Sequence, residues 1–431
     1  MGDIKKLLTD LKELDDNLVG CMRCGMCQAV CPVYKATLQE ADVTRGKIAL
    51  LEDLAHKVAK EASGVNDKLN RCLLCGSCQA NCPSGVKVLD IFLKARAIVG
   101  DYLGFSPIQK AIFRGVLQHP ALFDRLLQLG AKFQGPFMRQ ANEAAGTSCS
   151  PILSPLIGDR HFPKLAEQSF HKQCPSLDTP AGASGLRVAF FPGCVTDKMF
   201  PGVAAATLKV LAHYGVGVYL PAGLACCGIP AVASGDMETY NKLVQLNANI
   251  LDRGDFDYLI TPCATCTATI KETWPLLADN LPATTQEKVR LLAGKTMDMT
   301  AFLVNIVQIP LDTNCSKNDL KATYHDACHM RNSLGVTAEP RKIIRGASGY
   351  TFVEMPAADT CCGSGGSFTL KHYDLSKKVG NAKRDAVVAS KADVVMATCP
   401  ACMLQLMDMH SQNNDSVKVM HVIEAMAEAL P

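Results

Sequence analysis

Two runs of cysteine with the same spacing constrain this chain more than any other feature. Each run reads C-x2-C-x2-C-x3-C and is followed directly by proline. The runs consist of Cys21, Cys24, Cys27 and Cys31, and of Cys72, Cys75, Cys78 and Cys82. A zinc knuckle would use two C-x2-C pairs per site, and free core thiols would need no fixed spacing. Two complete quartets are instead typical of thiolates that hold cubane iron–sulfur clusters.

Each run is predicted to give its last cysteine to the cluster of the other run. Three thiolates on a tight loop bind three irons of one cube, and the fourth cysteine is carried too far to close on that cube. The first [4Fe-4S] cluster is therefore expected on Cys21, Cys24, Cys27 and Cys82, and the second on Cys72, Cys75, Cys78 and Cys31. Gly25 and Gly76 lie inside the loops, where a side chain would crowd the cluster.

Length and composition narrow the class of protein. A chain of 431 residues, 48% of them hydrophobic, predicts roughly three domains with buried cores. A net charge of +3 argues against a dedicated nucleic-acid binder. The chain has 21 cysteines, no visible signal peptide and no apolar run of the roughly 18 residues that a transmembrane helix needs. We therefore expect a cytoplasmic protein, peripheral at most on the inner face of the membrane, whose thiols bind metal rather than form disulfides.

The N-terminal segment predicts a helical domain around the two clusters. Apolar residues recur at helical spacing over 4–18, 48–62 and 88–99. The 51 residues that separate Cys21 from Cys72 exceed what a minimal two-cluster ferredoxin needs. Residues 1–104 are thus similar to the helical ferredoxin domains of fumarate and succinate oxidoreductases.

Residues 105–186 carry weaker signals. Basic residues alternate with apolar residues over 105–140. The basic residues are Lys110, Arg114, Arg125, Lys132 and Arg139. They could dock on anionic lipid or on an acidic partner, but Pro120 splits the segment into short helices. We favour a helical pair packed on the ferredoxin domain with a solvated basic side. Residues 141–186 are rich in Ser, Pro, Gly and Ala and are expected to form a linker, with Cys149 and Cys174 as bystanders.

The C-terminal half is a duplication. A single cysteine, a vicinal pair followed by glycine, and a C-x2-C pair occur twice, at offsets of 134, 135 and 136 residues. The two sets are Cys194, Cys226, Cys227, Cys263 and Cys266, and Cys328, Cys361, Cys362, Cys399 and Cys402. We place one cysteine-rich domain at 187–314 and the other at 315–431.

Each repeat alternates short apolar strands with amphipathic helices, which predicts a parallel sheet. The cysteines follow strand ends, where an open α/β sheet places its ligands. The expected fold class is α+β and multidomain: an N-terminal α-helical ferredoxin domain, then two duplicated α/β domains.

The residues do not decide fully which metal the repeats bind. Five thiols exceed the usual four of zinc, and vicinal cysteines make strained disulfides, so an iron–sulfur cluster in at least one repeat is the favoured interpretation. Zinc in one repeat and a redox disulfide are the alternatives. His325, Asp326 and His329 flank Cys328 as alternative ligands, as partners of the ligands, or as satisfied residues at a strand end, and we favour the last. The glycine-rich loop 363–367 lacks the lysine of a phosphate-binding loop, so backbone packing beside a cluster is favoured there.

Taken together, the motifs resemble a known family. CMRCGMCQAVCP, RCLLCGSCQANCPSG, TRGKI and CCGSGGSF, over nearly the whole chain, are similar to the iron–sulfur subunit of glycolate oxidase and to its relatives in D-lactate dehydrogenases. The C subunit of anaerobic glycerol-3-phosphate dehydrogenase and the heterodisulfide reductase subunit with CCG motifs are more distant relatives. The resemblance implies an electron carrier between a separate FAD subunit, which oxidises a 2-hydroxy acid, and a quinone or another acceptor.

Three functions compete on the sequence. The leading hypothesis is the electron-transfer subunit of a lactate or glycolate dehydrogenase, with no catalytic residue of its own for substrate oxidation. The chain shows no G-x-G-x-x-G after a strand and so needs a flavoprotein partner. A heterodisulfide-type reductase, or a structural adaptor that holds zinc and iron, would use the same cysteines differently. In heterodisulfide reductase the resemblance implies non-cubane clusters on all five cysteines, and both repeats retain all five.

Overall fold

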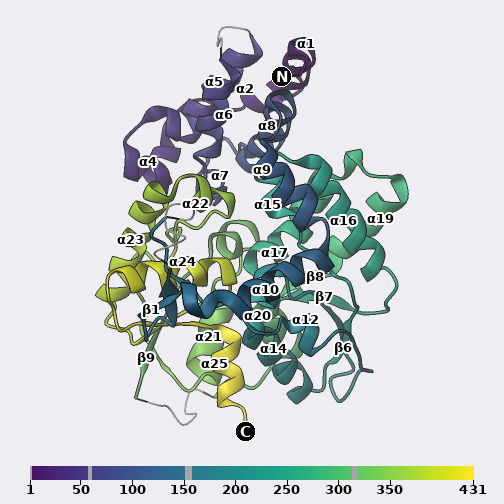
Figure 1. The fold of residues 1–431 in the computed structure, drawn as a ribbon, viewed down its shortest axis with the longest axis vertical. Coiled ribbons are helices and arrows are strands. Elements are labelled where there is room, and N and C mark those ends of the chain that lie inside the picture. The colour runs from purple at the N-terminus through teal and green to yellow at the C-terminus, as the bar shows by residue number, and fades with distance from the viewer. Residues whose placement is uncertain (1, 57–60, 151–157, 313–318) are drawn as a thin grey trace. The chain divides into compact units, whose positions relative to one another are not determined.

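The computed structural model of the chain describes residues 2–56, 61–150, 158–312 and 319–431 (Figure 1). These residues form two compact units. The first, called here the N-terminal unit, comprises Met1–Gln118, Gly228–Lys242 and Gly363–Val379. The second, called the repeat unit, comprises His119–Cys227, Leu243–Cys362 and Gly380–Pro431. Both vicinal cysteine pairs end at a boundary between the units, because the glycine that follows each pair begins a segment of the N-terminal unit.

The described elements within residues 2–118 are helices. They are α1 (Ile4–Lys12), α2 (Asp15–Val19), α3 (Met26–Val30), α4 (Pro32–Thr37), η1 (Glu40–Asp42), α5 (Thr44–Ala55), α6 (Ala62–Asn70), α7 (Ser77–Ala80), α8 (Val88–Leu103), α9 (Pro107–Lys110) and η2 (Ala111–Leu117). Helices α1, α5, α6 and α8 pack together and bury Leu11, Ile48 and Phe92 completely (Figure 1). The helix expected over 48–62 ends at Ala55, and residues 57–60 lie outside the described part of the chain.

Two segments from the C-terminal half complete the N-terminal unit. They contain α15 (Ile229–Val232), the start of α16 (Met237–Leu251), α22 (Ser367–Lys371) and the start of α23 (Tyr373–Ala389). Gly235 lies so close to α8 that a Cβ there would be 2.4 Å from the carbonyl oxygen of Arg96. A Cβ on Gly365 would be 2.6 Å from Cδ2 of Leu73. The glycine-rich loop 363–367 therefore serves close packing, as the sequence favoured.

The repeat unit contains two sheets that share the order of four parallel strands, and the first sheet has an additional edge strand, β4. The first is ordered β4-β6-β5-β7-β8 and the second β10-β9-β11-β12. Their strands are β4 (Leu177–Asp178), β5 (Arg187–Phe190), β6 (Gly217–Leu220), β7 (Tyr258–Thr261), β8 (Thr296–Asp298), β9 (Lys321–Tyr324), β10 (Thr351–Phe352), β11 (Val394–Ala397) and β12 (Lys418–His421). All neighbours pair in parallel except β4, which is antiparallel to β6. The prediction of parallel sheets is confirmed.

Helices cover these sheets and join the two repeats. They are α10 (Pro120–Phe137), α12 (Phe170–Gln173), α13 (Cys194–Met199), α14 (Pro201–His213), α17 (Ala264–Ala268), η3 (Thr269–Thr273), α18 (Trp274–Leu276), η4 (Ala278–Asn280), α19 (Ala283–Lys295), α20 (Met299–Ala301), η5 (Phe302–Val307), η6 (His329–Ser333), α21 (Ala338–Ala347), α24 (Pro400–Gln412) and α25 (Val422–Ala429). Helix α14 of the first repeat packs along α25 of the second, and Lys209 donates to the carbonyl oxygen of Ala427 at 2.7 Å (Figure 1). Val203 shares a core with Met403 and Leu406.

The segment expected to be a linker is packed instead. It contributes β1 (Arg139–Asn142), β2 (Thr147–Cys149) and β3 (Phe162–Pro163), which form an antiparallel sheet, as well as β4 of the first repeat. Thr147 and Ser148 are buried, and the backbone N–H of His161 donates to Asp408 of α24 at 2.9 Å. The small polar residues that suggested a linker therefore satisfy hydrogen bonds against α24. Residues 151–157 lie outside the described part.

The expected split of residues 105–140 at Pro120 is confirmed. Helices α9 and η2 precede Pro120 and belong to the N-terminal unit. Helix α10 begins at Pro120 and belongs to the repeat unit, so the expectation of a helical pair within the ferredoxin domain's unit is wrong for this second helix. The basic side of the first part is partly paired, because Arg114 approaches Asp236 at 3.6 Å and Glu238 at 2.8 Å. None of the helices in the described residues is long and apolar enough to cross a membrane.

Candidate metal centres

The eight cysteines of the two runs line two cavities of the N-terminal unit. The first cavity is lined by Cys21, Cys24, Cys27, Cys78 and Cys82. The second is lined by Cys31, Cys72, Cys75 and Cys78. Cys82 thus lies with the first three cysteines of the first run. Cys31 lies with the first three cysteines of the second run. This is the arrangement that crossed ligation of two clusters requires.

The tight loops around the cysteines place glycine where the backbone is left-handed. Gly25 and Gly76 precede α3 and α7 with φ of 86° and 75°, in the left-handed region that favours glycine. A Cβ on Gly25 would also lie 2.7 Å from Nη1 of Arg45, which donates to the carbonyl oxygen of Arg23 at 3.2 Å. Backbone conformation therefore disfavours larger residues at both positions, and a Cβ on Gly25 would require the guanidinium of Arg45 to shift.

The second cavity has a buried cation at its wall. Burial raises the pKa of the Cys31 thiol to about 12 and holds the pKa of Cys78 well above its usual value. Lys47 also lines this cavity, is 1% exposed and donates to the carbonyl oxygen of Asp42. Burial lowers the pKa of Lys47, and the nearby thiols of Cys72 and Cys31 oppose that lowering. Metal loading would release protons from these thiols, and Lys47 would offset part of the resulting negative charge.

The two cavities differ in exposure. Cys24 of the first cavity is exposed, whereas Cys75 of the second is buried. Solvent exposure and nearby charge are among the factors that set the reduction potential of an iron–sulfur cluster. Two clusters bound in these cavities would therefore have different potentials.

The five cysteines of the first repeat form one connected group. Cys194 begins α13 directly after Gly193, and Cys263 precedes α17 at the end of β7. The Sγ atoms of Cys194 and Cys226 are 3.6 Å apart. Hydrogen bonds with Cys194 and Cys227 raise the pKa of Cys226, and hydrogen bonds with Cys227 and Cys263 raise the pKa of Cys266. The five thiols are thus linked in one network, with Cys194 half-buried and the other four buried, that offers sulfur ligands to a metal centre.

The second repeat repeats this placement and meets the first. Cys328 precedes η6, and Cys399 precedes α24 at the end of β11. Hydrogen bonds with Cys362 and Cys399 raise the pKa of Cys402. Hydrogen bonds with Cys263 of the first repeat, which has the larger effect, and with Cys402 lower the pKa of Cys399. The two groups of thiols are therefore adjacent, joined by Cys263 and Cys399.

Thr265 also links the two repeats at this point. Its hydroxyl lies 3.4 Å from Sγ of Cys399 and 3.1 Å from Nδ1 of His329. His329 thus has a hydrogen-bond partner, as the sequence favoured for the histidines near Cys328. Asp326 is likewise satisfied by Arg341, which approaches it at 2.7 and 2.8 Å.

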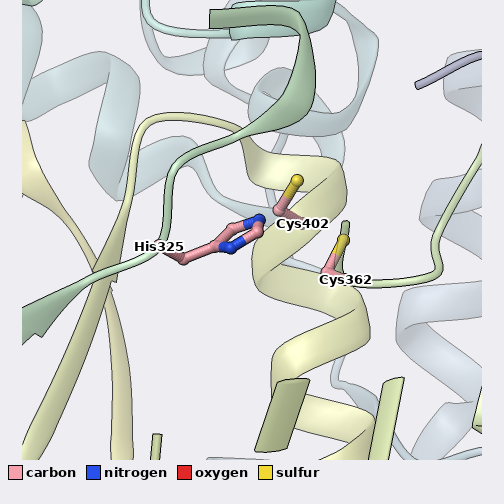
Figure 2. Close-up of side chains that lie close together, drawn as sticks. All are labelled: His325, Cys362 and Cys402. Carbon is pink, nitrogen blue, oxygen red and sulfur yellow. The ribbon is translucent and has the colours of Figure 1, made fainter. Parts of the chain in front are cut away.

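His325 behaves differently from its neighbours. It is 0% exposed, and its ring lies with Cys362 and Cys402 so that the three candidate ligand atoms are within 4.8 Å of one another (Figure 2). Burial, with the nearby Lys383, lowers the pKa of His325 to about 3, so the imidazole is neutral at physiological pH. A neutral imidazole and two thiols are a donor set that suits iron or zinc.

Sequence reasoning missed the buried cations around these sites. Lys47 directly precedes Ile48, where the helix expected from apolar spacing begins. Lys383 is buried near the vicinal pair of the second repeat and donates to the carbonyl oxygens of Ala357 and Ala358 at 2.6 and 3.1 Å. A charged residue at a core position of an amphipathic helix is the signal that could have revealed both. Cys149 and Cys174 are not part of the groups described above, and Cys315 lies outside the described residues.

Comparisons with known proteins agree with these groupings. A family model described as a 4Fe-4S dicluster domain matches residues 17–86, and one described as a cysteine-rich domain matches 188–271 and 322–407. The chain is 29% identical to the probable glycolate oxidase iron-sulfur subunit of Bacillus subtilis, over 99% of this chain and 98% of that protein. It is 28% identical to a subunit of the fumarate reductase (CoM/CoB) of Methanothermobacter marburgensis, over 95% of this chain and 72% of that protein. It is 31% identical to lactate utilization protein A of an Exiguobacterium species, over 56% of this chain and 98% of that protein.

Proposed function

Because the chain belongs to the family of iron–sulfur proteins that includes the glycolate oxidase iron–sulfur subunit and lactate utilization protein A, we propose that it is the electron-transfer subunit of a flavin-dependent 2-hydroxy acid dehydrogenase. It receives electrons from a separate FAD subunit that oxidises lactate or glycolate, and it passes them to a quinone or another acceptor.

The observation that carries this proposal is the grouping of cysteines around the two cavities. Each cavity contains the first three cysteines of one run and the last cysteine of the other, and Cys78 lines both cavities. Cubane clusters bound there would accept and release single electrons. The role of this chain is to hold the thiolates and to balance part of their charge with Lys47. It also buries Lys47 and Cys75 of the second site.

The division of labour with a flavoprotein follows from electron counting. Oxidation of a 2-hydroxy acid to the 2-oxo acid removes two electrons and two protons together, which is the chemistry of a flavin. The reduced flavin can then release its electrons one at a time. The sequence motif for a dinucleotide is absent from this chain, so the flavin is assigned to a partner.

The cysteine groups of the repeats are proposed to hold further iron–sulfur centres. Five linked thiols in the first repeat provide more sulfur ligands than a zinc site uses, although zinc in one repeat is compatible with the donors of either group. A second candidate function uses these centres for catalysis. The contact between Cys263 and Cys399 places two thiol groups side by side, as a reductase of disulfide substrates could use them.

The experiment is co-expression of the full chain with a flavoprotein that oxidises a 2-hydroxy acid. The chain alone is expected not to oxidise lactate or glycolate, and the complex is expected to reduce one-electron acceptors with one of them. Turnover of a 2-hydroxy acid by the flavin-free chain would contradict the proposal. Reduction of a disulfide by the chain with an artificial donor, and no electron uptake from the flavoprotein, would favour the second candidate.

A further inference from the structure

The imidazole of His325 is buried, and no described residue hydrogen-bonds to it. Its exposed fraction is 0%, and neither Nδ1 nor Nε2 has a hydrogen-bond partner among the described residues. A buried polar group without a hydrogen bond is destabilising, and native proteins leave few of them. A partner other than the polypeptide would account for this side chain.

The surroundings of the ring indicate what that partner is. Figure 2 shows the imidazole side by side with the thiols of Cys362 and Cys402, and the ligand atoms of the three residues lie within 4.8 Å of one another. His325 follows β9, Cys402 lies in the first turn of α24, and Cys362 ends the vicinal pair. Three separate segments thus bring one nitrogen and two sulfur donors to the same place.

The first repeat lacks this nitrogen. The offset of 134 residues that relates Cys194 to Cys328 places Phe191 at the position of His325. Phe191 is equally buried, at 0% exposed, but offers no ligand atom. Packing at this position therefore needs only a ring of about this size, and the histidine of the second repeat adds a metal donor to it.

We propose that His325 supplies a nitrogen ligand to an iron centre held by the cysteines of the second repeat, so that the two repeats hold centres with different ligands. The inference rests on the proposed function, in which the repeats hold iron–sulfur centres. Imidazole is an established ligand of iron, and its substitution for thiolate raises the reduction potential of an iron–sulfur centre. The second repeat would then hold its electron more tightly than an all-thiolate centre.

The test is pulsed EPR on the full chain, purified without oxygen and labelled with 15N only in histidine. Spectra are recorded at a series of poised potentials for the wild type, for His325→Phe and for His329→Gln. Phenylalanine keeps the ring volume found at Phe191 and removes the donor. His329 is the matched control, because it follows Cys328 directly in the chain but bonds to Thr265. Iron and zinc are counted in the same samples.

The expected result is a histidine nitrogen coupled to an iron centre in the wild type and in His329→Gln, and the loss of that coupling in His325→Phe. Coupling that persists in His325→Phe, or that disappears only in His329→Gln, would overturn the proposal. So would a wild type that carries iron in the repeats without any histidine coupling. Iron confined to the two cubane sites would instead contradict the proposed iron–sulfur centres of the repeats, and with them this ligand.

Discussion

Arg96 donates a hydrogen bond at 2.7 Å to the main-chain carbonyl of Ala233, a residue 137 positions further along the chain. Its guanidinium also donates to the carbonyl oxygens of Leu69 and Cys72, at 2.6 and 2.8 Å. One buried side chain thus ties the second cysteine run to the segment that follows the vicinal pair of the first repeat. The connection holds together parts of the N-terminal unit that are distant in sequence.

Replacing Arg96 should therefore destabilise the whole N-terminal unit. Arg96→Lys keeps a charge but cannot reach three separated carbonyl groups with a planar fork. Hydrogen bonds to charged groups contribute about 1.5–3 kcal/mol each, so we expect a loss of at least about 2 kcal/mol and a clearly lower melting temperature. The melting temperature is measured without oxygen, with circular dichroism as the signal. The control is Arg253→Lys, because Arg253 is exposed. Equal melting of Arg96→Lys and the control would show that the three bonds are not needed.

The crossed pairing of the cysteine runs can be tested with one substitution in each cavity. Cys31→Ser should alter the EPR signal of the cluster held by Cys72, Cys75 and Cys78, because Cys31 lines their cavity. Cys82→Ser should alter the other signal. Cys174→Ser should change neither. If Cys31→Ser damaged only the cluster of its own run, the pairing proposed here would be wrong.

The metal content of the repeats is a separate prediction. Two cubanes account for about eight irons per chain, so well over eight irons are expected if the repeats hold iron–sulfur centres. Cys227→Ser and Cys362→Ser should each lower the excess, because each removes a buried thiol from one group. Metal and sulfide analysis of anaerobic samples gives the count. About eight irons with stoichiometric zinc would favour the zinc alternative.

The stability of the repeat unit should depend on pH through His421. The Nε2 atom of His421 lies 2.9 Å from the carbonyl oxygen of Pro262, and Nδ1 accepts from the backbone N–H of Ile423 at 3.2 Å. Burial lowers the pKa of His421 to about 4, against about 6.5 in an unfolded chain. Between these values the unfolded chain binds a proton that the folded chain excludes. Stability is therefore lost as pH falls from 6.5 towards 4, by at most about 1.4 kcal/mol per pH unit from this group.

His421→Asn should flatten that dependence. His421 is the N-cap of α25, a position where asparagine is favourable, and asparagine does not titrate. Urea unfolding in oxygen-free buffer, at several values between pH 5.5 and 7.5, compares the slopes of the variant and the wild type. A variant slope as steep as that of the wild type would assign the pH dependence to other groups.

Much of the cysteine chemistry was predictable because ligand spacing is a local property of the chain. The runs at Cys21 and Cys72 predicted which thiols share a cavity, and the constant offsets predicted two similar sheets. The strands before Cys263 and Cys399 were recognisable from their apolar residues. The short strands β8 and β12 were not, because each contains polar residues and gains its place by pairing at a sheet edge.

Other features depend on contacts between distant segments, and no local pattern predicts them. Nothing in residues 228–242 or 363–379 indicates that they fold with the N-terminal helices, since the contacts involve glycines and main-chain carbonyl groups. His325 was interpreted as a satisfied residue at a strand end. Only the structure shows that neither ring nitrogen has a hydrogen-bond partner among the described residues and that the ring lies beside Cys362 and Cys402.

The most direct test of the account is rapid mixing of the complete complex with lactate or glycolate. The wild type should show flavin reduction first and then bleaching of the iron–sulfur absorbance as electrons leave the flavin singly. Cys75→Ala should retain the first phase and lose passage of electrons to the acceptor, whereas Cys174→Ser should behave as the wild type. Reduction of the acceptor at an undiminished rate by a complex whose Cys72–Cys78 cluster is missing would contradict the central claim that this chain conducts the electrons.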